Sequence, residues 1–428
     1  MNNLTIRLSK KIDLKFLPLA LGGLTVAMVV AWILSGYFGY DVHVLISYFS
    51  SDHPGNILVG DRAFGVHTFS DYLLAHEYAT AGNPWVNSLV PANNYPPLPM
   101  ALFWIFSLLP YKIGLVTYLL LAFCSMIYPI IRELSRTKTF NEYGAVLVPC
   151  ILSVGVIAAL DRGNYVAFLV TPLYLFIKAI REEKWGSSAL LLGLMVALKI
   201  YPAVLLVVYL RKRKILPILL VALYSVGSSI VAAYAFPGDV KTTLKTMSSA
   251  VFGFGGDGTF GLNPYNVSLF SAISRILSRI PSLSEELQTF TNHQWYIGIF
   301  YMALVAFVVI AQRIPFVISM FLLVSTLWLV PPLNFHYVSS LLLAPLAIAI
   351  GNSRGSKKPL SDTHSYSILY SLTTISILLT LLPIVIPMSH GPENAMRTIP
   401  SLCWLVLAIF ATSWSLVPAS RPERIQRV

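Results

Sequence analysis

The sequence has little charge. Charged residues make up only 11% of the 428-residue chain, and 18 of them are acidic. Soluble domains carry about 25% charged residues, so this composition excludes an ordinary water-soluble protein. Hydrophobic residues reach 56% and the mean hydropathy is +0.72. Long apolar runs recur from one end of the chain to the other, which predicts an all-α, polytopic integral membrane protein.

Several common signatures are also missing. The three cysteines lie inside apolar runs and show neither metal-ligand nor disulfide spacing. No GxxxxGK[ST] loop and no GxGxxG motif between a strand and a helix is present, which argues against a cytoplasmic nucleotide site. The net charge of +12 does not indicate nucleic acid, because the basic residues sit at the ends of apolar runs, where they orient helices. No soluble module, internal repeat or low-complexity tract interrupts the chain, so residues 1–428 are expected to form a single integral domain.

The apolar runs predict about 12 transmembrane helices with both termini in the cytoplasm, because Lys and Arg flank alternate ends. The first run lacks a convincing cleavage site, so a retained helix is expected rather than a signal peptide. The two halves of the run 187–210 account for two of the crossings. The other predicted spans are 16–38, 112–131, 143–160, 163–180, 215–235, 295–312, 314–330, 337–351, 366–387 and 398–416.

The run 187–210 decides this topology. Basic residues stand at both of its ends, so one crossing cannot place both in the cytoplasm. Lys199-Ile200-Tyr201-Pro202 interrupts the run. We therefore predict two short helices with Lys199 at the outer turn between them. An isolated Lys in lipid costs several kcal/mol, so a polar cavity or an anionic partner is expected there.

Two outer segments and one short helix complete the predicted arrangement. The segment 39–96 is an outer loop, and 97–109 is too short to span and is predicted to be an interfacial or re-entrant helix. The segment 236–294 is also outside. Within it, Asn266 to Ile280 alternates between an apolar and a polar face, which is typical of an interfacial amphipathic helix.

The first outer loop carries the main catalytic candidate. Thr68 to Gly82 is predicted to be a helix, with Asp71 near its start. We predict Asp71 as a catalytic base, although a carboxylate three residues after Thr68 is also what a capping box provides. His76 is a rival base. Asp61 is interpreted as a turn residue.

The unusual polar residues are predicted to meet on the outer side. They come from loops far apart in sequence, and their convergence is a hypothesis for a site. They are Asp71, Asp161, Lys199, Asn263, Asn266, Arg275 and His336. A carboxylate can take the proton of an acceptor hydroxyl, and cations can stabilise a leaving phosphate. This set suits sugar transfer from a lipid-linked phosphate.

A series of short motifs resembles a known family. In order they are Phe69-x-Asp71-Tyr72, Gly82-Asn83-Pro84-Trp85, Tyr95-Pro96-Pro97-Leu98, Arg162-Gly163-Asn164, Ala197-Leu198-Lys199-x-Tyr201-Pro202, Asn266-x-Ser268 and Pro332-x-x-Phe335-His336-Tyr337. Over about residues 60–340 the chain resembles the GT-C superfamily of polyprenol-phosphate-sugar-dependent glycosyltransferases, and most closely glycosyltransferase family 87, a mannosyl- and arabinosyltransferase-like group.

The resemblance implies an inverting transferase of the plasma membrane with its active site on the outer face. Its donor would be a polyprenyl-phosphate sugar and its acceptor a cell-envelope glycolipid or glycan. The family's catalytic Asp matches Asp71, its Lys before an aromatic-Pro pair matches Lys199, and its late His matches His336. Arg275, Asp161, Asn266 and Tyr95 complete the predicted substrate-binding set.

Two positions depart from the family pattern. Members commonly have Gly-Gln after the third span, where this chain has Asp161-Arg162-Gly163-Asn164, and they often have Trp shortly before the late His, where it has Asn334-Phe335. The first departure leaves open whether Asp161 is a second functional carboxylate or half of an interfacial ion pair with Arg162.

Other interpretations stay open at this stage. Asp71 and Asp161 could share a divalent metal, but no ligand cluster requires one and none is predicted. Lys199 could extend to lipid headgroups, and Arg275 could anchor the amphipathic helix in the same way. A transporter or lipid flippase is the alternative function, and it would need paired broken helices in two related halves. A non-catalytic assembly factor would not require Asp71.

Overall fold

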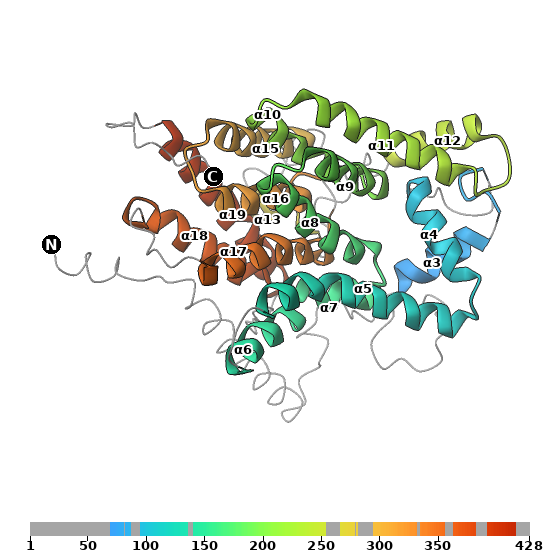
Figure 1. The fold of residues 1–428 in the computed structure, drawn as a ribbon, viewed down its shortest axis with the longest axis horizontal. Helices are drawn as coiled ribbons and strands as arrows, with labels where there is room; N and C mark the ends of the chain where they lie inside the picture. The colour runs from blue at the N-terminus through green and yellow to red at the C-terminus, as the bar shows by residue number, and fades with distance from the viewer. Residues whose placement is uncertain are drawn as a thin grey trace.

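The structure, a computed structural model, describes residues 69–80, 82–86, 95–135, 140–253, 266–278, 280, 294–331, 334–355, 363–381 and 392–416. Every regular element in these ranges is a helix, and none is a strand (Figure 1). The all-α prediction is therefore confirmed. The predicted span 16–38, residues 39–68 of the outer loop, and Asn263 lie outside the described residues.

The helices follow one another with short connections. In chain order they are α3 (Ser70–Thr80), α4 (Pro97–Ser107), α5 (Tyr111–Leu134), α6 (Phe140–Ile151), α7 (Val154–Arg162), η2 (Tyr165–Leu169), α8 (Val170–Arg181), α9 (Trp185–Leu198), η3 (Tyr201–Leu206), α10 (Val207–Arg211), α11 (Ile215–Ala233), α12 (Val240–Gly253), α13 (Leu269–Leu277), α15 (Gln294–Ala311), α16 (Phe316–Leu329), η5 (His336–Leu342), α17 (Leu343–Gly355), α18 (Thr363–Leu381) and α19 (Pro392–Leu416). The η elements are 3₁₀ helices.

Three helices among the described residues are long and apolar enough to cross a membrane: α5, α11 and the Thr398–Leu416 part of α19. Only 17% of the apolar window of α11 is buried inside the protein. Its exposed residues include Ile215, Leu219 and Val231. A helix that exposes this much apolar surface is suited to lipid rather than water. The predicted total of about 12 spans is not confirmed and stays a prediction.

Two helices rather than one occupy the predicted span 143–160, and its crossing of the membrane stays a prediction. α6 ends at Ile151 and α7 begins at Val154, with Ser153 in an extended conformation between them. Pro149 cannot donate its backbone nitrogen to the last turns of α6, which weakens the helix there. Packing against η5 fixes the start of α7. Gly155 lies so close to η5 that a Cβ atom on it would be 2.4 Å from the Ser340 backbone nitrogen.

The predicted break at Lys199 is confirmed. α9 ends at Leu198, and Lys199 has extended φ and ψ angles of −151° and 134°. η3 begins at Tyr201 with Pro202 in its first turn, a position that lacks a hydrogen-bond partner within the helix and therefore suits proline. α9 itself packs along α8 and α11.

Three pairs of consecutive helices, called rods below, have the same arrangement. In each, a short 3₁₀ helix leads directly into an α-helix: η2 into α8, η3 into α10, and η5 into α17. The three 3₁₀ starts meet around Lys199, as described below. Residues near the other ends of the three rods line a single cavity. The rods therefore run in the same direction, from the Lys199 end of the protein to the opposite end, and α8 packs against α17.

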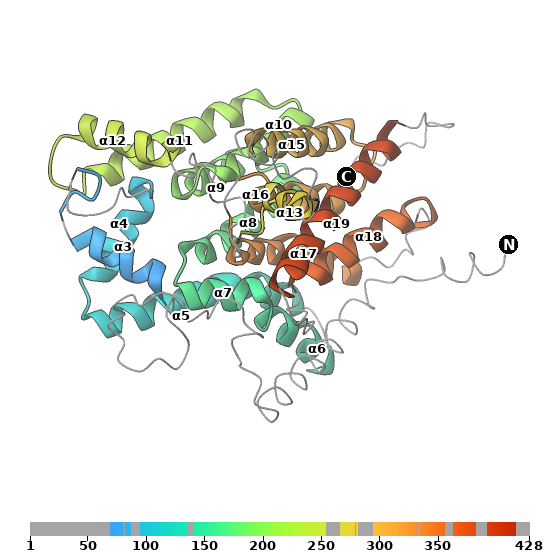
Figure 2. The same cartoon turned by 180° about the vertical axis from the view of Figure 1, so that it is seen from behind.

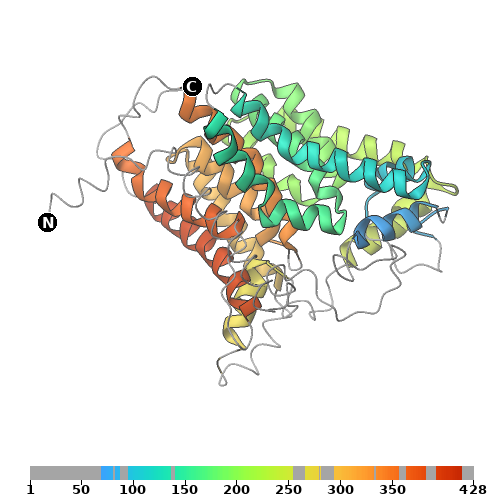
Figure 3. The ribbon, with the colours of Figure 1, turned by 90° about the horizontal axis from the view of Figure 1, so that it is seen from below.

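Helices α3, α4 and α12 gather at the Lys199 end, beyond the main bundle (Figures 1 and 2). The predicted helices at Thr68–Gly82 and 97–109 correspond to α3 and α4, whereas α12 was not predicted. Asn83, after α3, donates through Nδ2 to Thr243 Oγ1 of α12 at 2.7 Å. This bond joins the predicted first outer loop to the second, and Figure 3 shows α3, in blue, at the end of the protein remote from α19, in red.

The amphipathic segment 266–280 forms α13, but its faces are buried differently from the prediction. The polar residues Ser271, Ser274 and Arg275 are buried, while the apolar residues Ile276 and Ile280 are exposed. The reason is tertiary, because α13 packs against α15 and α19. Its placement at a membrane interface stays a prediction.

Candidate active site

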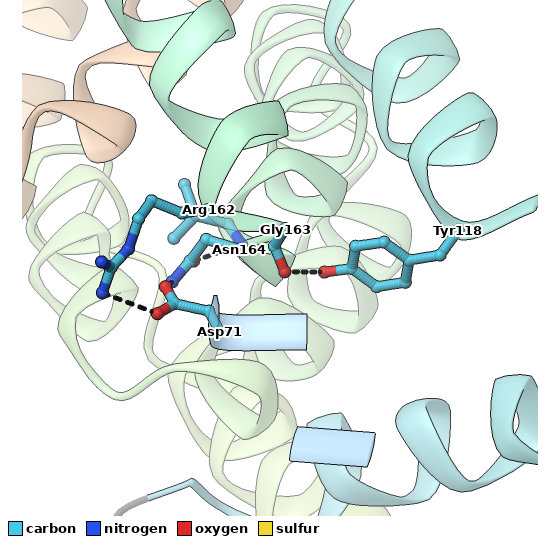
Figure 4. Close-up of polar contacts among 6 residues, drawn as sticks. Asp71, Tyr118, Arg162, Gly163 and Asn164 are labelled. Atoms are coloured by element: carbon cyan, nitrogen blue, oxygen red, sulfur yellow. Dashed lines mark hydrogen bonds and ion pairs between the residues drawn. The ribbon is translucent and has the colours of Figure 1, made fainter. Parts of the chain in front are cut away.

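Asp71 lies in the first turn of α3 and is 9% exposed. Both of its carboxylate oxygens are bound by side chains from the end of α7 (Figure 4). Arg162 Nη2 contacts Oδ1 at 2.9 Å, and Asn164 Nδ2 donates to Oδ2 at 2.6 Å. Asp71 therefore does more than cap its own helix, since two segments about 90 residues apart in sequence meet at its side chain.

The segment that holds Asp71 is itself rigid. Gly163 ends α7 in the left-handed conformation, with φ +62°, and a Cβ atom there would lie 2.7 Å from Tyr72 Cβ. Its carbonyl oxygen accepts a hydrogen bond from Tyr118 Oη of α5 at 2.9 Å (Figure 4). Asn164 Oδ1 caps η2 by accepting from the Val166 backbone nitrogen at 3.0 Å. These contacts fix the direction in which Arg162 and Asn164 point.

An aromatic cluster lies beneath Asp71. The Tyr72 ring is fully buried and packs on Phe103, Tyr111 and Tyr118, with ring centroids 4.9–6.3 Å apart. Burial, together with the nearby Tyr111, raises the pKa of Tyr72 to about 12. Tyr72 therefore stays neutral at physiological pH and acts as an apolar support for α3.

Lys199 lies inside a box of three tyrosine rings. Its Nζ atom is 5.0 Å from the ring centroid of Tyr165, 5.2 Å from that of Tyr201 and 5.3 Å from that of Tyr337. A desolvated cation–π contact is worth about 2 kcal/mol. Desolvation lowers the pKa of Lys199 to about 8, while the charge of Asp71 acts in the opposite direction and favours the ammonium form. The box therefore places the half-buried Lys199 where the charge of Asp71 acts on it.

The three tyrosines of the box mark three helix starts. Tyr165 and Tyr201 are the first residues of η2 and η3, and Tyr337 is the second residue of η5. The η2–α8 and η5–α17 rods are long, and the N-terminus of a helix carries about half a positive charge. Together with Lys199, these helix starts create a positive region suited to an anion such as phosphate.

Tyr95 belongs to the same region. Its ring packs edge-on against Tyr165 at 5.3 Å, and the charges of Asp71 and Arg162 both act on its hydroxyl group. Its backbone oxygen accepts from Trp85 Nε1 at 2.9 Å, which ties it to the outer loop. Tyr95 thus lies beside the Asp71 and Lys199 groups, as a substrate-binding role requires.

His336 is the first residue of η5 and is half-buried. Its neighbour Tyr337 faces Lys199, and η5 packs against α7 and η2, the elements that position Asp71. His336 therefore starts an element that forms one wall of the region. Its predicted contact with substrate stays a prediction.

Asn266 and Arg275 form a second polar cluster. Arg275 Nη2 donates to the Asn266 backbone oxygen at 2.5 Å, and Asn266 Oδ1 accepts from the Asn334 backbone nitrogen at 3.0 Å. Val267 donates in return to the Asn334 oxygen at 2.8 Å. These bonds brace the start of α13 against the chain that leads into His336. Both predicted residues therefore connect to the site through this brace.

Asp161 lies in the last turn of α7, and its side chain is outside the described part of the structure. Arg162, its candidate ion-pair partner in the sequence, contacts Asp71. Among the described residues, no three His, Cys, Asp or Glu side chains gather closely enough to hold a metal ion.

The rival base His76 lies one turn after Asp71 on α3. It is half-buried, with its ring 5.4 Å from that of Tyr111, and burial lowers its pKa below the ordinary value. The next residue, Glu77, is exposed. Asp61 lies outside the described residues. Of the acidic side chains described on α3, Asp71 is the one bound to the α7 segment.

The family comparison agrees with this geometry. The model of glycosyltransferase family 87 matches residues 93–332 of the chain. This chain belongs to glycosyltransferase family 87. It is therefore a glycosyltransferase, an enzyme that moves a sugar from a donor to an acceptor. A search of the curated proteins finds no match to the chain.

The matched range of this family 87 enzyme contains Arg162, Asn164 and Lys199, while Asp71 and His336 lie outside it. The base candidate of the enzyme is thus held by residues inside the matched part. The motif-based predictions gave Asn164 and Tyr201 no role, and they gave Arg162 only a candidate ion pair with Asp161. Tyr165 and Tyr337 each follow a polar residue, whereas Tyr201 follows Ile200, so the sequence carries no common signal for the three rings around Lys199.

Proposed function

We propose that this glycosyltransferase moves a sugar, mannose or arabinose-like, from a polyprenyl-phosphate donor to a cell-envelope glycolipid or glycan. The observation that carries the proposal is the proximity of a held carboxylate, Asp71, to a half-buried lysine, Lys199. Asp71 is fixed by Arg162 and Asn164. The charge of Asp71 acts on Lys199 in its tyrosine box. A base and a phosphate-binding cation are the two groups that such a transfer requires.

In the proposed reaction Asp71 accepts the proton of the acceptor hydroxyl group. The hydroxyl oxygen forms a bond to the anomeric carbon, and the bond from that carbon to the phosphate oxygen breaks. Attack from the face opposite the phosphate inverts the anomeric configuration. Each carboxylate oxygen can accept about two hydrogen bonds, so the bonds from Arg162 and Asn164 leave acceptor directions on Asp71 for the hydroxyl.

The departing polyprenyl phosphate carries the negative charge that develops in this step. Lys199 and the three helix starts around it offer positive charge for that phosphate. Tyr95, His336 and Asp161 are proposed to contact the sugar or the acceptor. Arg275 and Asn266 are proposed to assist through the brace that they form beneath His336.

Basic residues support an active site on the outer face of the plasma membrane. Among the described residues, Arg132, Lys178, Arg181 and the Arg211–Lys214 run stand at helix ends remote from Asp71. Basic loops favour the cytoplasmic side of a membrane. With those ends inside, the Asp71 end faces out, where a lipid-linked donor is available and a nucleotide sugar is not.

The test compares the intact enzyme with Asp71→Asn, using membranes and a panel of radiolabelled polyprenyl-phosphate sugars. Asn keeps the size of the side chain and removes the base. We expect transfer from one donor by the intact enzyme and a loss of about 10²-fold or more in the variant. Glu77→Gln is the matched control, because it removes an exposed carboxylate from the same helix.

Equal transfer by the intact enzyme and Asp71→Asn, at equal expression, would reject Asp71 as the base and turn attention to His76 or Asp161. No transfer by the intact enzyme from any polyprenyl-phosphate sugar of the panel would reject the proposed donor class. A similar loss in Glu77→Gln would show that the assay reports the stability of α3 rather than catalysis.

A further inference from the structure

A second charged site lies at the end of the protein remote from Asp71. A cavity of about 540 Å³ opens there between the ends of α5, α8, α10 and α17 and the start of α16. Four basic side chains line it: Lys178, Arg181, Arg211 and Lys212. Two acidic side chains, Glu133 and Glu182, also line it.

The position of this basic cavity separates it from the candidate active site. The η2–α8 rod begins at Tyr165, beside Lys199, and ends at Arg181, in the cavity wall. Helical rises of about 2.0 and 1.5 Å per residue give this rod a length of roughly 28 Å. The hydrocarbon core of a membrane is about 30 Å thick. The cavity and Asp71 therefore lie at opposite ends of an apolar layer of membrane dimensions.

The acidic residues of the basic cavity already have partners. Glu182 Oε2 contacts Lys184 Nζ at 2.7 Å, outside the cavity lining. Glu133 is buried and accepts a hydrogen bond from Tyr174 Oη. It also packs against Gly351, where a Cβ atom would lie 2.3 Å from Glu133 Oε2. The positive charge of the four basic residues therefore exceeds the negative charge that faces them.

The guanidinium group of Arg211 is held in place before any ligand binds. Its Nη1 atom donates to Ser319 Oγ at 3.1 Å, and its Cζ atom lies 5.9 Å from the Phe316 ring centroid. Its Nε atom is buried and has no hydrogen-bond partner among the described residues. Arg181 is also positioned, because its Nη1 atom donates to Asn352 Oδ1 at 2.8 Å.

We propose that the basic cavity binds a phosphate-bearing anion. Guanidinium groups match phosphate oxygens in geometry, and positioned Arg side chains lose little freedom on binding. The volume lies within the range of about 300–1,000 Å³ that small-ligand sites occupy. The phosphate belongs either to the headgroup of an acidic lipid or to a soluble phosphate compound. This inference does not depend on the reaction at Asp71.

The test measures binding to the full-length protein in neutral detergent by its thermal unfolding midpoint, since a ligand that binds the folded state raises that midpoint. One arm adds phosphatidylglycerol against phosphatidylcholine, and the other adds inorganic pyrophosphate at constant ionic strength. Each arm compares the intact protein with Arg211→Gln, Lys178→Gln and the control Arg213→Gln. Arg213 is an exposed cation two residues after Arg211 that does not line the cavity.

We expect a saturable rise of the midpoint in at least one arm, with the half-saturating concentration raised about tenfold in Arg211→Gln and Lys178→Gln and unchanged in Arg213→Gln. A rise with phosphatidylglycerol alone identifies a lipid headgroup, and a rise with pyrophosphate identifies a soluble ligand. No saturable rise in either arm, or equal weakening in Arg213→Gln, overturns the proposal. If Arg211→Gln fails to fold, Lys178→Gln decides, and unchanged affinity in that variant overturns the proposal.

Discussion

Asn164 Nδ2 donates a hydrogen bond to Asp71 Oδ2 at 2.6 Å, although 93 residues separate the two in the sequence. The amide orientation is fixed from the other side, because Asn164 Oδ1 accepts from the Val166 backbone nitrogen at 3.0 Å. An amide serves both partners, since it offers a donor and an acceptor, whereas an ionised carboxylate can only accept. Asn164 is therefore a positioning residue for the candidate base.

Replacing Asn164 is expected to slow catalysis more than it weakens donor binding. Asn164→Asp keeps the cap on η2 but turns a second negative charge toward Asp71. Misplaced catalytic groups cost up to about 10²-fold in rate, so we expect kcat to fall about 10- to 100-fold with little change in the KM for the donor. Steady-state transfer kinetics measure both values. Asn83→Asp is the control, because Asn83 also bridges two segments but contacts Thr243 rather than Asp71. Equal kcat losses in both variants would contradict a specific role for Asn164.

Gly163→Ala is expected to destabilise the protein. The left-handed conformation of residue 163 costs a non-glycine residue about 1–3 kcal/mol, and the new methyl group would press on Tyr72. We expect a lower thermal unfolding midpoint and reduced transfer. Gly227→Ala in α11 is the matched control, since nothing lies within 4 Å of its added Cβ atom and the loss of a helical glycine stabilises by about 0.5–1 kcal/mol. A lowered midpoint in Gly227→Ala, equal to that of Gly163→Ala, would mean that the geometry at residue 163 is not the cause.

Two substitutions at Tyr201 separate its ring from its hydroxyl group. The Tyr201 hydroxyl has no hydrogen-bond partner among the described residues, while its ring centroid lies 5.2 Å from Lys199 Nζ. Tyr201→Phe keeps the ring, so donor KM and stability are expected to stay within about twofold and about 0.5 kcal/mol of the intact enzyme. Tyr201→Leu removes a cation–π contact, and we expect donor KM to rise about tenfold. The same KM in both variants would show that the ring does not position Lys199.

The burial of His76 predicts a loss of stability in acid. Its folded-state pKa lies below the ordinary value of 6.5, so between these two pKa values the unfolded chain binds more protons than the folded protein. Stability contributed by neutral His76 is complete above pH 6.5 and declines as the pH falls below it. We expect the unfolding midpoint of the intact protein to fall more between pH 7.5 and about pH 5 than that of His76→Gln. Glu77→Gln, on the same helix, is expected to follow the intact protein. Identical pH profiles for all three would reject the buried histidine as the source.

The activity of His76→Gln also tests the rival base. If Asp71 is the base, the variant retains transfer to within about tenfold, because among the described residues the His76 ring packs on Tyr72 and Tyr111 and contacts no part of the α7 segment that holds Asp71. A loss as large as that of Asp71→Asn, measured at equal expression and at a pH where both variants are folded, would favour His76 instead.

Most of the helix positions could be predicted from local sequence. Hydrophobic length indicates α5 and α11, and the Lys199-Ile200-Tyr201-Pro202 sequence indicates a break, because Pro202 disfavours a helical conformation in the residue before it. The break between α6 and α7 was not predicted. Pro149 alone leaves a helix kinked or continuous, and the close approach of Gly155 to η5, about 185 residues later, completes the interruption.

The candidate site was likewise predicted only in part from the sequence. Asp71 and Lys199 were predicted from residue type and motif, since a charged group in an apolar chain needs a reason to be there. The sequence could not show that Arg162 and Asn164 hold Asp71, nor that the rings of Tyr165 and Tyr337 lie around Lys199. Each of these partners comes from another helix, and local patterns carry no information about which helix ends will meet.

The sequence by itself determined that this protein is helical, strongly apolar and interrupted at Lys199, because these properties follow from side-chain hydropathy and from backbone limits within a few residues. The tertiary structure decided the pairing of Asp71 with Arg162 and Asn164, the burial of the polar face of α13, and the basic cavity. Each of these features depends on the packing of helix ends that are remote in sequence. The apolar pattern allows several ways of packing those helix ends, and close contacts and single hydrogen bonds select one of them.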